Sequence, residues 1–136
     1  MRFLKLCGAA LMTFASLTVS AAEPAQNKTM SLDRDSIIEL VSEKTTECRK
    51  EKDGSLCANY FSEDGVVVQV MREDGERKDG VWFVDDSERL CILWKGKIKP
   101  LCFEVFEQDD GTYNLVKHDK HISTIIGSED GNPNKF

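Results

Sequence analysis

The cysteines are the residues of this chain whose type and spacing point most directly to chemistry. Cys7 lies in an apolar amino-terminal segment, and Cys48, Cys57, Cys91 and Cys102 follow it. Structural zinc sites use closely spaced Cys-x-x-Cys pairs or cysteines combined with histidines, and these spacings fit neither pattern. Cysteines of a small exported domain form disulfides instead. We therefore predict two disulfides, no metal site and no cofactor.

The pairing of these cysteines is predicted from a hairpin centred on Gly96-Lys97. A two-residue turn at this dipeptide places Cys91 opposite Cys102 on adjacent strands. Cys48 and Cys57 then form the second disulfide. Four cysteines allow three pairings, and the hairpin register favours this one.

Two histidines and three acidic pairs are the other candidates for chemistry. His118 and His121 flank Asp119 in a segment typical of a solvated turn, with a metal pair as the alternative interpretation. The acidic pairs lie beside predicted turns, although two carboxylates could also share acid and base roles in a glycosidase. The chain has no Gly-x-Ser-x-Gly elbow, no phosphate-binding glycine loop and no His-Glu-x-x-His helix. We predict no catalytic residue. The acidic pairs are Glu63-Asp64, Asp85-Asp86 and Asp109-Asp110.

Three aromatic residues on predicted strands are candidates for a ligand site. Most strand aromatics in a small domain lie in the core. If the strands form a barrel with an open mouth, Trp82, Trp94 and Tyr113 could instead line an apolar pocket.

The amino-terminal segment is typical of a secretory signal peptide. Arg2 and Lys5 precede an uncharged, mostly apolar run over 6–19, and small residues follow it. We predict a signal peptide over 1–21, cut after Ala21 or Ala22, and a periplasmic or secreted protein. A lipoprotein acylated on Cys7 and a retained anchor are the alternatives. The apolar run is shorter than the ~20 residues of a membrane span, so none is expected after cleavage.

The charge of the chain disfavours some partners. The 136 residues include 18 basic and 24 acidic ones, which gives a net charge of -6. Loss of Arg2 and Lys5 with the leader lowers the net charge to -8. A chain this acidic is repelled by phosphate backbones, so no nucleic-acid partner is expected.

The rest of the sequence predicts one domain that is mainly β. We expect a disordered lead-in over 22–30, a single β-rich domain over 31–127 and a polar tail over 128–136. The domain begins with a helix over 31–47, capped by Ser31, whose apolar stripe packs on the sheet. Alternating segments separated by Asp-Gly-type turns then predict an antiparallel meander of about seven strands, forming a small barrel or a bent sheet. These strands are 56–61, 66–71, 80–84, 89–95, 98–107, 112–117 and 121–126.

The central part of the chain resembles a known family. Tyr60-Phe61, a Gly-Val-Trp stretch from Gly80, Leu90-Cys91-Ile92-Leu93-Trp94, Cys102 and Gly111-Thr112-Tyr113 follow its layout. The family comprises small exported proteobacterial proteins whose domain has no assigned function. The resemblance covers about 31–127 and implies a β-rich fold and a periplasmic or secreted location. It carries over no catalytic residue, and the Cys48 and Cys57 pair lies outside its pattern.

Three hypotheses for the function follow. The first is a non-enzymatic exported domain that binds a protein or a small apolar ligand. The second is an inhibitor of a basic envelope-targeting enzyme such as lysozyme, because the chain without its leader has a net charge of -8. Periplasmic lysozyme inhibitors are similar in fold, as small disulfide-stapled β-barrels. Their Ser-Gly-x-x-Tyr motif has its nearest counterpart in Asp110-Gly111-Thr112-Tyr113, which lacks the serine. The third is a hydrolase that uses the acidic pairs or the histidines.

Overall fold

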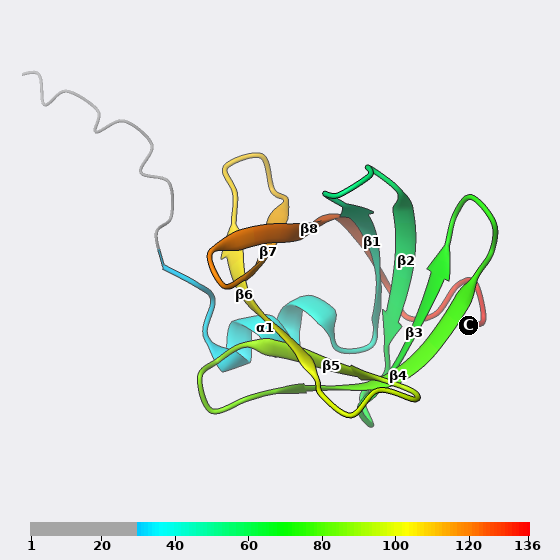
Figure 1. Ribbon diagram of the computed structural model, residues 1–136, viewed down its shortest axis with the longest axis horizontal. Coiled ribbons are helices and arrows are strands. Elements are labelled where there is room, and N and C mark those ends of the chain that lie inside the picture. Colours follow the sequence, from blue (N-terminus) through cyan, green and yellow to red (C-terminus); the bar gives the residue numbers. More distant parts are fainter. Residues whose placement is uncertain (1–29) are drawn as a thin grey trace, which may run out of the picture.

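A computed structural model describes residues 30–136, and its strands form a closed barrel (Figure 1). Each of the eight strands pairs antiparallel with its neighbours in sequence, and β1 pairs with β8. The prediction of a mainly β fold with an antiparallel meander is therefore confirmed. The predicted signal peptide, Cys7 and most of the predicted lead-in lie outside the described residues.

The strands begin and end close to the turn residues that predicted them. The predicted segments 56–61 and 66–71 match their strands at both ends, and the other five differ from theirs by one or more residues. The strands are β1 (Lys44–Lys50), β2 (Leu56–Phe61), β3 (Val66–Met71), β4 (Arg77–Val84), β5 (Leu90–Trp94), β6 (Leu101–Glu107), β7 (Tyr113–Lys117) and β8 (Lys120–Asp130).

The predicted helix over 31–47 is wrong in its second half. Helix α1 spans Arg34–Val41, and Asp33 rather than Ser31 caps it by accepting a hydrogen bond from Ser36 N at 2.9 Å. Glu43 then adopts a left-handed φ of 57° and turns the chain into β1. The β-branched Thr45-Thr46 pair favours a strand, and β1 is the strand missing from the predicted seven.

The closing pair of strands also explains a difference at the carboxyl end. β8 continues to Asp130, beyond the predicted strand 121–126 and into the predicted polar tail. Its last residues pair with the start of β1, where Lys44 faces Asp130 and Thr46 faces Ser128. Because β1 needs a partner on each side, these polar residues are held in the sheet despite their composition.

Helix α1 packs across one end of the barrel. Ile37 and Val41 are fully buried and join the core cluster with side chains such as Phe61 and Val84. Arg34 fixes the helix to the end of β4, because its Nη1 and Nη2 donate to Val84 O and Asp85 O, each at 3.0 Å. The inward residues at this end of the strands are therefore covered by the helix.

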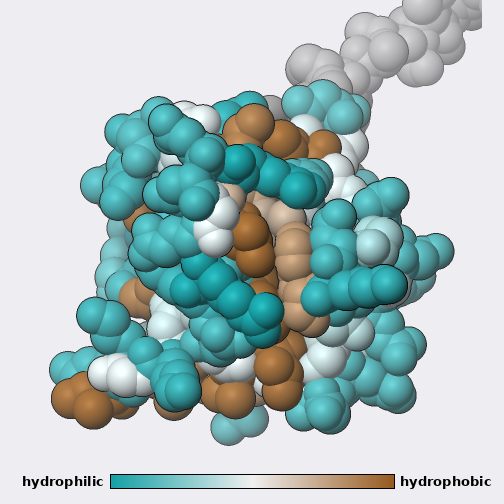
Figure 2. All heavy atoms as spheres, turned by 90° about the vertical axis from the view of Figure 1, so that its right-hand side faces the viewer, coloured by the Kyte–Doolittle hydropathy of each residue, from teal (hydrophilic) through white to brown (hydrophobic). Residues whose placement is uncertain are grey.

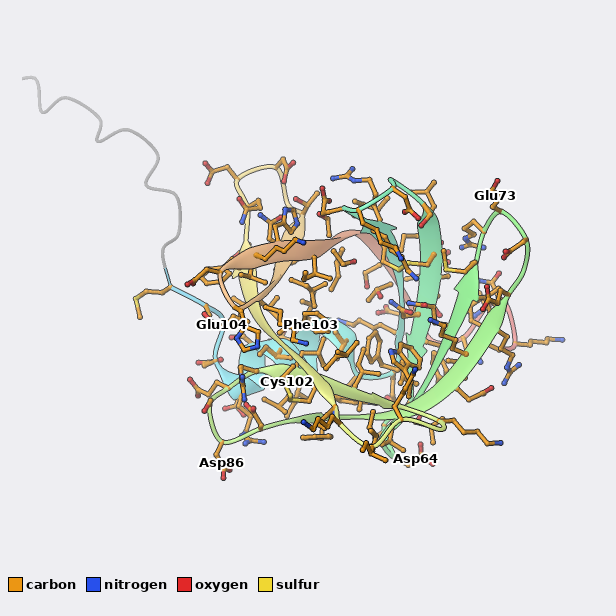
Figure 3. The ribbon with its side chains drawn as sticks, viewed as in Figure 1. Asp64, Glu73, Asp86, Cys102, Phe103 and Glu104 are labelled. Carbon is orange, nitrogen blue, oxygen red and sulfur yellow. A yellow bond between two sulfur atoms is a disulfide. The ribbon has the colours of Figure 1, made fainter. Side chains whose placement is uncertain are left out.

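Inward and outward side chains alternate along the strands, as expected for a barrel. On β6, Phe103 points into the barrel and is buried, whereas its neighbour Glu104 points away and is exposed (Figure 3). The buried members of the core cluster are Ile37, Val41, Phe61, Val67, Trp82, Val84, Leu90, Ile92, Phe103, Val105, Leu115 and Ile125.

The pairing of β5 with β6 is the shortest in the barrel. It has three register pairs, with Cys91 opposite Cys102 at its centre and 4.0 Å between their α-carbons. This confirms the predicted register and disulfide. The predicted two-residue turn at Gly96-Lys97 is wrong, because Lys97 N donates to Trp94 O at 3.0 Å and places Lys95 and Gly96 at the centre of the turn. Pro100 has no N–H group to extend the ladder. The Cys91–Cys102 bond therefore joins β5 to β6 where the fewest backbone pairs hold two neighbouring strands together. The second disulfide, Cys48–Cys57, joins β1 to β2.

We predict that Cys91→Ala/Cys102→Ala lowers the free energy of unfolding by about 3 kcal/mol and loosens the β5–β6 seam, which is the short pairing between these two strands. The loss in global stability follows from the loop of 11 residues that the bond closes. Chemical denaturation measures this loss, and amide hydrogen exchange at Leu90 and Phe103 reports on the seam.

Cys48→Ala/Cys57→Ala is the matched control, because its bond closes a loop of similar length, 9 residues, between strands with six register pairs. It should lose similar global stability without faster exchange in β5. If the amide hydrogens of β5 exchange equally fast in both double variants, the β5–β6 seam is not the weakest strand pairing of the barrel.

Candidate functional site

A cavity of about 750 Å³ occupies the end of the barrel opposite α1. Its lining comes from the end of β1, the start of β2, the start of β4, the end of β5 and the start of β8, which meet at this end. The volume lies within the range of roughly 300–1,000 Å³ that is usual for small-molecule sites. On the face drawn in Figure 2, hydrophilic side chains cover most of the surface, and hydrophobic ones are visible in a central hollow and in smaller patches.

One wall of the cavity is apolar and comes mainly from β5, β6 and β7. Inward side chains of these strands face the cavity, and residues of β2 and β8 complete the wall. The wall consists of Phe61, Leu90, Ile92, Trp94, Leu101, Phe103, Leu115, Ile122 and Ile125.

Trp94 stands at the outer end of this wall because Gly80 leaves room for it. A Cβ atom on Gly80 would lie 3.0 Å from Trp94 Cε3 and 2.6 Å from Leu93 O. Gly80 faces Trp94 in the register of β4 and β5. The side-chain-free position therefore lets the indole ring lie close to β4.

The opposite wall, from β1, β2 and β3, is polar. Asn59 Nδ2 donates to Cys48 Sγ at 3.2 Å, and Gln69 Nε2 donates to Asn59 Oδ1 at 3.0 Å. Thr46 is fully buried in this wall, and its Oγ1 has no hydrogen-bond partner within residues 30–136. Unpaired buried hydroxyls are costly, so Thr46 marks a place where a ligand could supply a polar atom.

Lysines surround the mouth of the cavity. They belong to the ends of β1, β4 and β8 and to the loops that join β1 to β2 and β5 to β6. Glu51 is the one acidic residue among the lining residues described. The lining lysines are Lys50, Lys52, Lys78, Lys97, Lys99 and Lys120.

Two of these lysines interact closely with the cavity. Burial, followed by repulsion from Lys78 and Lys52, lowers the pKa of Lys50. Lys78 Nζ lies 6.0 Å from the centre of the Trp94 ring, which is within cation–π range. A partly desolvated ammonium group next to other cations gains more from an anionic partner than a fully solvated one does.

Glu51 is held by its own neighbours. Thr124 Oγ1 donates to Glu51 Oε1 at 2.6 Å, and His121 Nε2 donates to Thr124 Oγ1 at 2.8 Å if it carries the ring proton. The Thr124 hydrogen bond, with smaller contributions from the charges of His121 and Arg49, holds the pKa of Glu51 below its usual value. The carboxylate is thus ionised and already hydrogen-bonded.

The three aromatic candidates lie in different places. Trp94 lines the cavity, whereas Trp82 is buried in the core, where its indole N–H donates to Ser62 O at 2.8 Å and its ring meets Phe61 edge-on at 5.8 Å. Tyr113 packs against the core and is not among the cavity-lining residues. Ligand binding by these residues stays a prediction.

The other candidates for chemistry lie mainly in turns. His118 and Asp119 have φ values of 49° and 62° in the β7–β8 turn and are exposed, whereas His121 lines the cavity. Asp85 Oδ1 accepts hydrogen bonds from the backbone N–H groups of Ser87 and Arg89, as predicted for a turn residue. The glycosidase alternative gains no support from these contacts.

Asp85 also belongs to the one group of three potential metal ligands found within residues 30–136. The other two members are Cys91 and Cys102. Their sulfur atoms are bonded to each other, so the group offers a single carboxylate. One carboxylate is too few ligands for a zinc or calcium site.

The sequence did not predict the lysine cluster. Successive members are separated by up to 26 positions in the chain, as between Lys52 and Lys78, and form no basic run. Their proximity to predicted turns was the available signal. Only the pairing of the strands shows that these turns lie at the same end of the barrel.

We predict that Thr46→Val raises the free energy of unfolding by about 1 kcal/mol, because a methyl group of similar shape replaces an unpaired buried hydroxyl. Thr45→Val is the matched control. Thr45 is also buried, but its Oγ1 donates to Gly131 O at 2.9 Å, so its loss should cost about 1 kcal/mol. Urea denaturation measures the free energy of unfolding of both variants. Destabilisation by Thr46→Val would show that the hydroxyl is already satisfied.

Comparisons with known proteins do not assign this chain to a family. No family model, no curated protein and no solved structure matches the chain, so the family resemblance stays a prediction. In the part of the chain that the structure describes, no helix is long and apolar enough to cross a membrane.

Proposed function

We propose that this chain is an exported, non-enzymatic binding protein that holds a small, largely apolar molecule inside its barrel. The observation that carries this proposal is the cavity of about 750 Å³ with a continuous apolar wall. Eight-stranded barrels have room for side chains or for one small ligand. Here the helix fills one end, and the other end is left open to a ligand.

The proposal favours a small molecule over a large partner because the apolar wall of the cavity is concave. Ile92 and Phe103 are buried within the barrel, where only a molecule that enters the mouth could touch them. A protein partner would instead need an apolar surface of several hundred Å² on the outside. The geometry therefore favours the small-ligand form of the binding hypothesis.

The two disulfides support both parts of the proposal. They are compatible with an oxidising, extracytoplasmic compartment. They also join neighbouring strands of the cavity wall, β1 to β2 and β5 to β6. Such crosslinks preform a site and reduce the entropy that a ligand must overcome.

A neutral apolar fluorophore tests the cavity directly. N-phenyl-1-naphthylamine should bind one per chain, with increased emission and with a change in the fluorescence of Trp94. Leu101→Trp should weaken this binding about tenfold or more, because Leu101 lines the cavity and a larger side chain fills its space. Fluorescence titration measures the dissociation constant.

Leu56→Trp provides the control. Leu56 is 45% exposed, close to the 38% of Leu101, but it does not line the cavity. Its variant should bind the fluorophore like the unaltered protein. If the fluorophore does not bind the unaltered protein, the proposed function is wrong.

Export is tested by the mass of the protein recovered from cells. We expect the extracytoplasmic fraction to contain a chain that begins at Ala22 or Glu23, four mass units below the fully reduced form because of its two disulfides. Intact-mass spectrometry before and after reduction gives both values. A cytosolic chain that retains Met1 and its leader would contradict the proposal.

A further inference from the structure

We propose that the ligand is an anionic amphiphile, with one carboxylate, sulfate or phosphate head group held by the lysines at the mouth and a hydrocarbon chain in the barrel. This inference rests on the proposed function and deepens it. It specifies the chemical class and the orientation of the bound molecule.

Positive charge is concentrated at the mouth of the cavity. The chain has a net charge of -6, yet six lysines and a single acidic residue line this cavity. A cluster of one sign around a low-dielectric opening concentrates the field at the opening. An anion is therefore attracted to the mouth and repelled by most of the remaining surface.

These lysines form no ion pair with the described residues, although Asp53 and Glu76 exert a weaker attraction on Lys50. Within residues 30–136, no carboxylate lies within 4.0 Å of their amino groups. Arginines elsewhere do form ion pairs, such as Arg72 with Glu47 and Arg89 with Asp85. The one acidic residue of the lining, Glu51, already accepts a hydrogen bond from Thr124. A bound anion would relieve the repulsion among the lysines.

Charged and apolar surfaces follow one another along the cavity, from the mouth inward. Lys97 and Lys99 lie in the loop just beyond β5, while Ile92 in the middle of β5 and its partner Leu101 at the start of β6 line the same cavity. Phe103 lies one inward position further along β6. Charge at the opening followed by hydrocarbon inside matches the order of groups in a single-chain amphiphile.

Two of the lysines lie beside the apolar wall and not only on the outer loops. Lys50 on β1 is only partly exposed, and Lys78 approaches the ring of Trp94. Ammonium groups therefore stand at the edge of the apolar wall as well as on the outer loops. A head group at this depth could contact lysines while its chain follows the wall of β5 and β6.

Calorimetric titration with three ligands of equal chain length tests the inference. Decyl sulfate should bind at least tenfold more tightly than the neutral decyl maltoside, and decyltrimethylammonium should bind at least tenfold more weakly than the neutral ligand. Octyl sulfate should bind roughly fifteenfold more weakly than decyl sulfate, since each of the two missing methylenes contributes about fourfold. Inorganic sulfate alone should bind too weakly to compete at equal concentration.

Lysine variants locate the head group. Lys50→Gln/Lys120→Gln should weaken decyl sulfate binding about tenfold and leave decyl maltoside binding within about twofold. Lys44→Gln/Lys135→Gln changes the net charge equally at residues that do not line the cavity, so its effect should stay within about twofold. Raising the NaCl concentration from about 20 mM to about 500 mM should weaken the binding of decyl sulfate and leave the binding of decyl maltoside unchanged.

The outcomes separate the two proposals. If the neutral fluorophore binds and the three decyl ligands bind equally, the cavity binds apolar molecules without preference and the head-group inference is wrong. If inorganic sulfate competes as well as decyl sulfate, the lysines form a simple anion site, which also overturns it. If neither the fluorophore nor any decyl ligand binds, the proposed function fails first and this inference fails with it.

Discussion

The hydrogen bonding between β1 and β8 is the interaction on which the rest of the structure depends. These strands are separated by most of the domain in sequence, and their pairing converts a meander into a barrel. Without it, both strands would have an unpaired edge open to other chains. The polar wall of β1 would also lose its position opposite the apolar wall of β5 and β6, and no enclosed cavity would form.

Closure gives the two ends of the barrel different properties. At one end, Ile37 and Val41 of α1 complete the core, and Arg34 secures the helix to the end of β4. At the other end, the strands run into short loops that carry lysines and leave the interior open. The Cys91–Cys102 bond holds the short β5–β6 pairing between these ends. A rigid wall with one opening is the arrangement that a preformed ligand site requires.

Several features of the open end are unfavourable to stability on their own. Lys50 is partly buried beside other cations, and Thr46 keeps an unpaired hydroxyl. Apolar side chains such as Leu101 remain partly exposed around the cavity. Features that lower stability often belong to functional sites, where binding offsets their cost. Their concentration at one end of the molecule is consistent with a site there.

Local pattern was sufficient for much of the fold. Two-residue periodicity and Asp-Gly turns placed β2 and β3 to the residue. The register that joins Cys91 to Cys102 was also predicted correctly, although the turn itself has Lys95 and Gly96 rather than Gly96 and Lys97 at its centre. These features depend on neighbours within about a dozen residues, which a sequence displays directly. The segment that became β1 was misassigned because its partner in β8 is distant in sequence and the β-branched Thr45-Thr46 pair is only a short local signal for a strand.

The sequence by itself thus determined the mainly β class, most strands and both disulfides. The tertiary structure alone decided that the sheet closes, that Trp94 rather than Trp82 lines the cavity, and that lysines from four parts of the chain surround one opening. Each of these depends on which strand ends share an end of the barrel. That arrangement is set by the long-range β1–β8 pairing and has no counterpart in residue spacing.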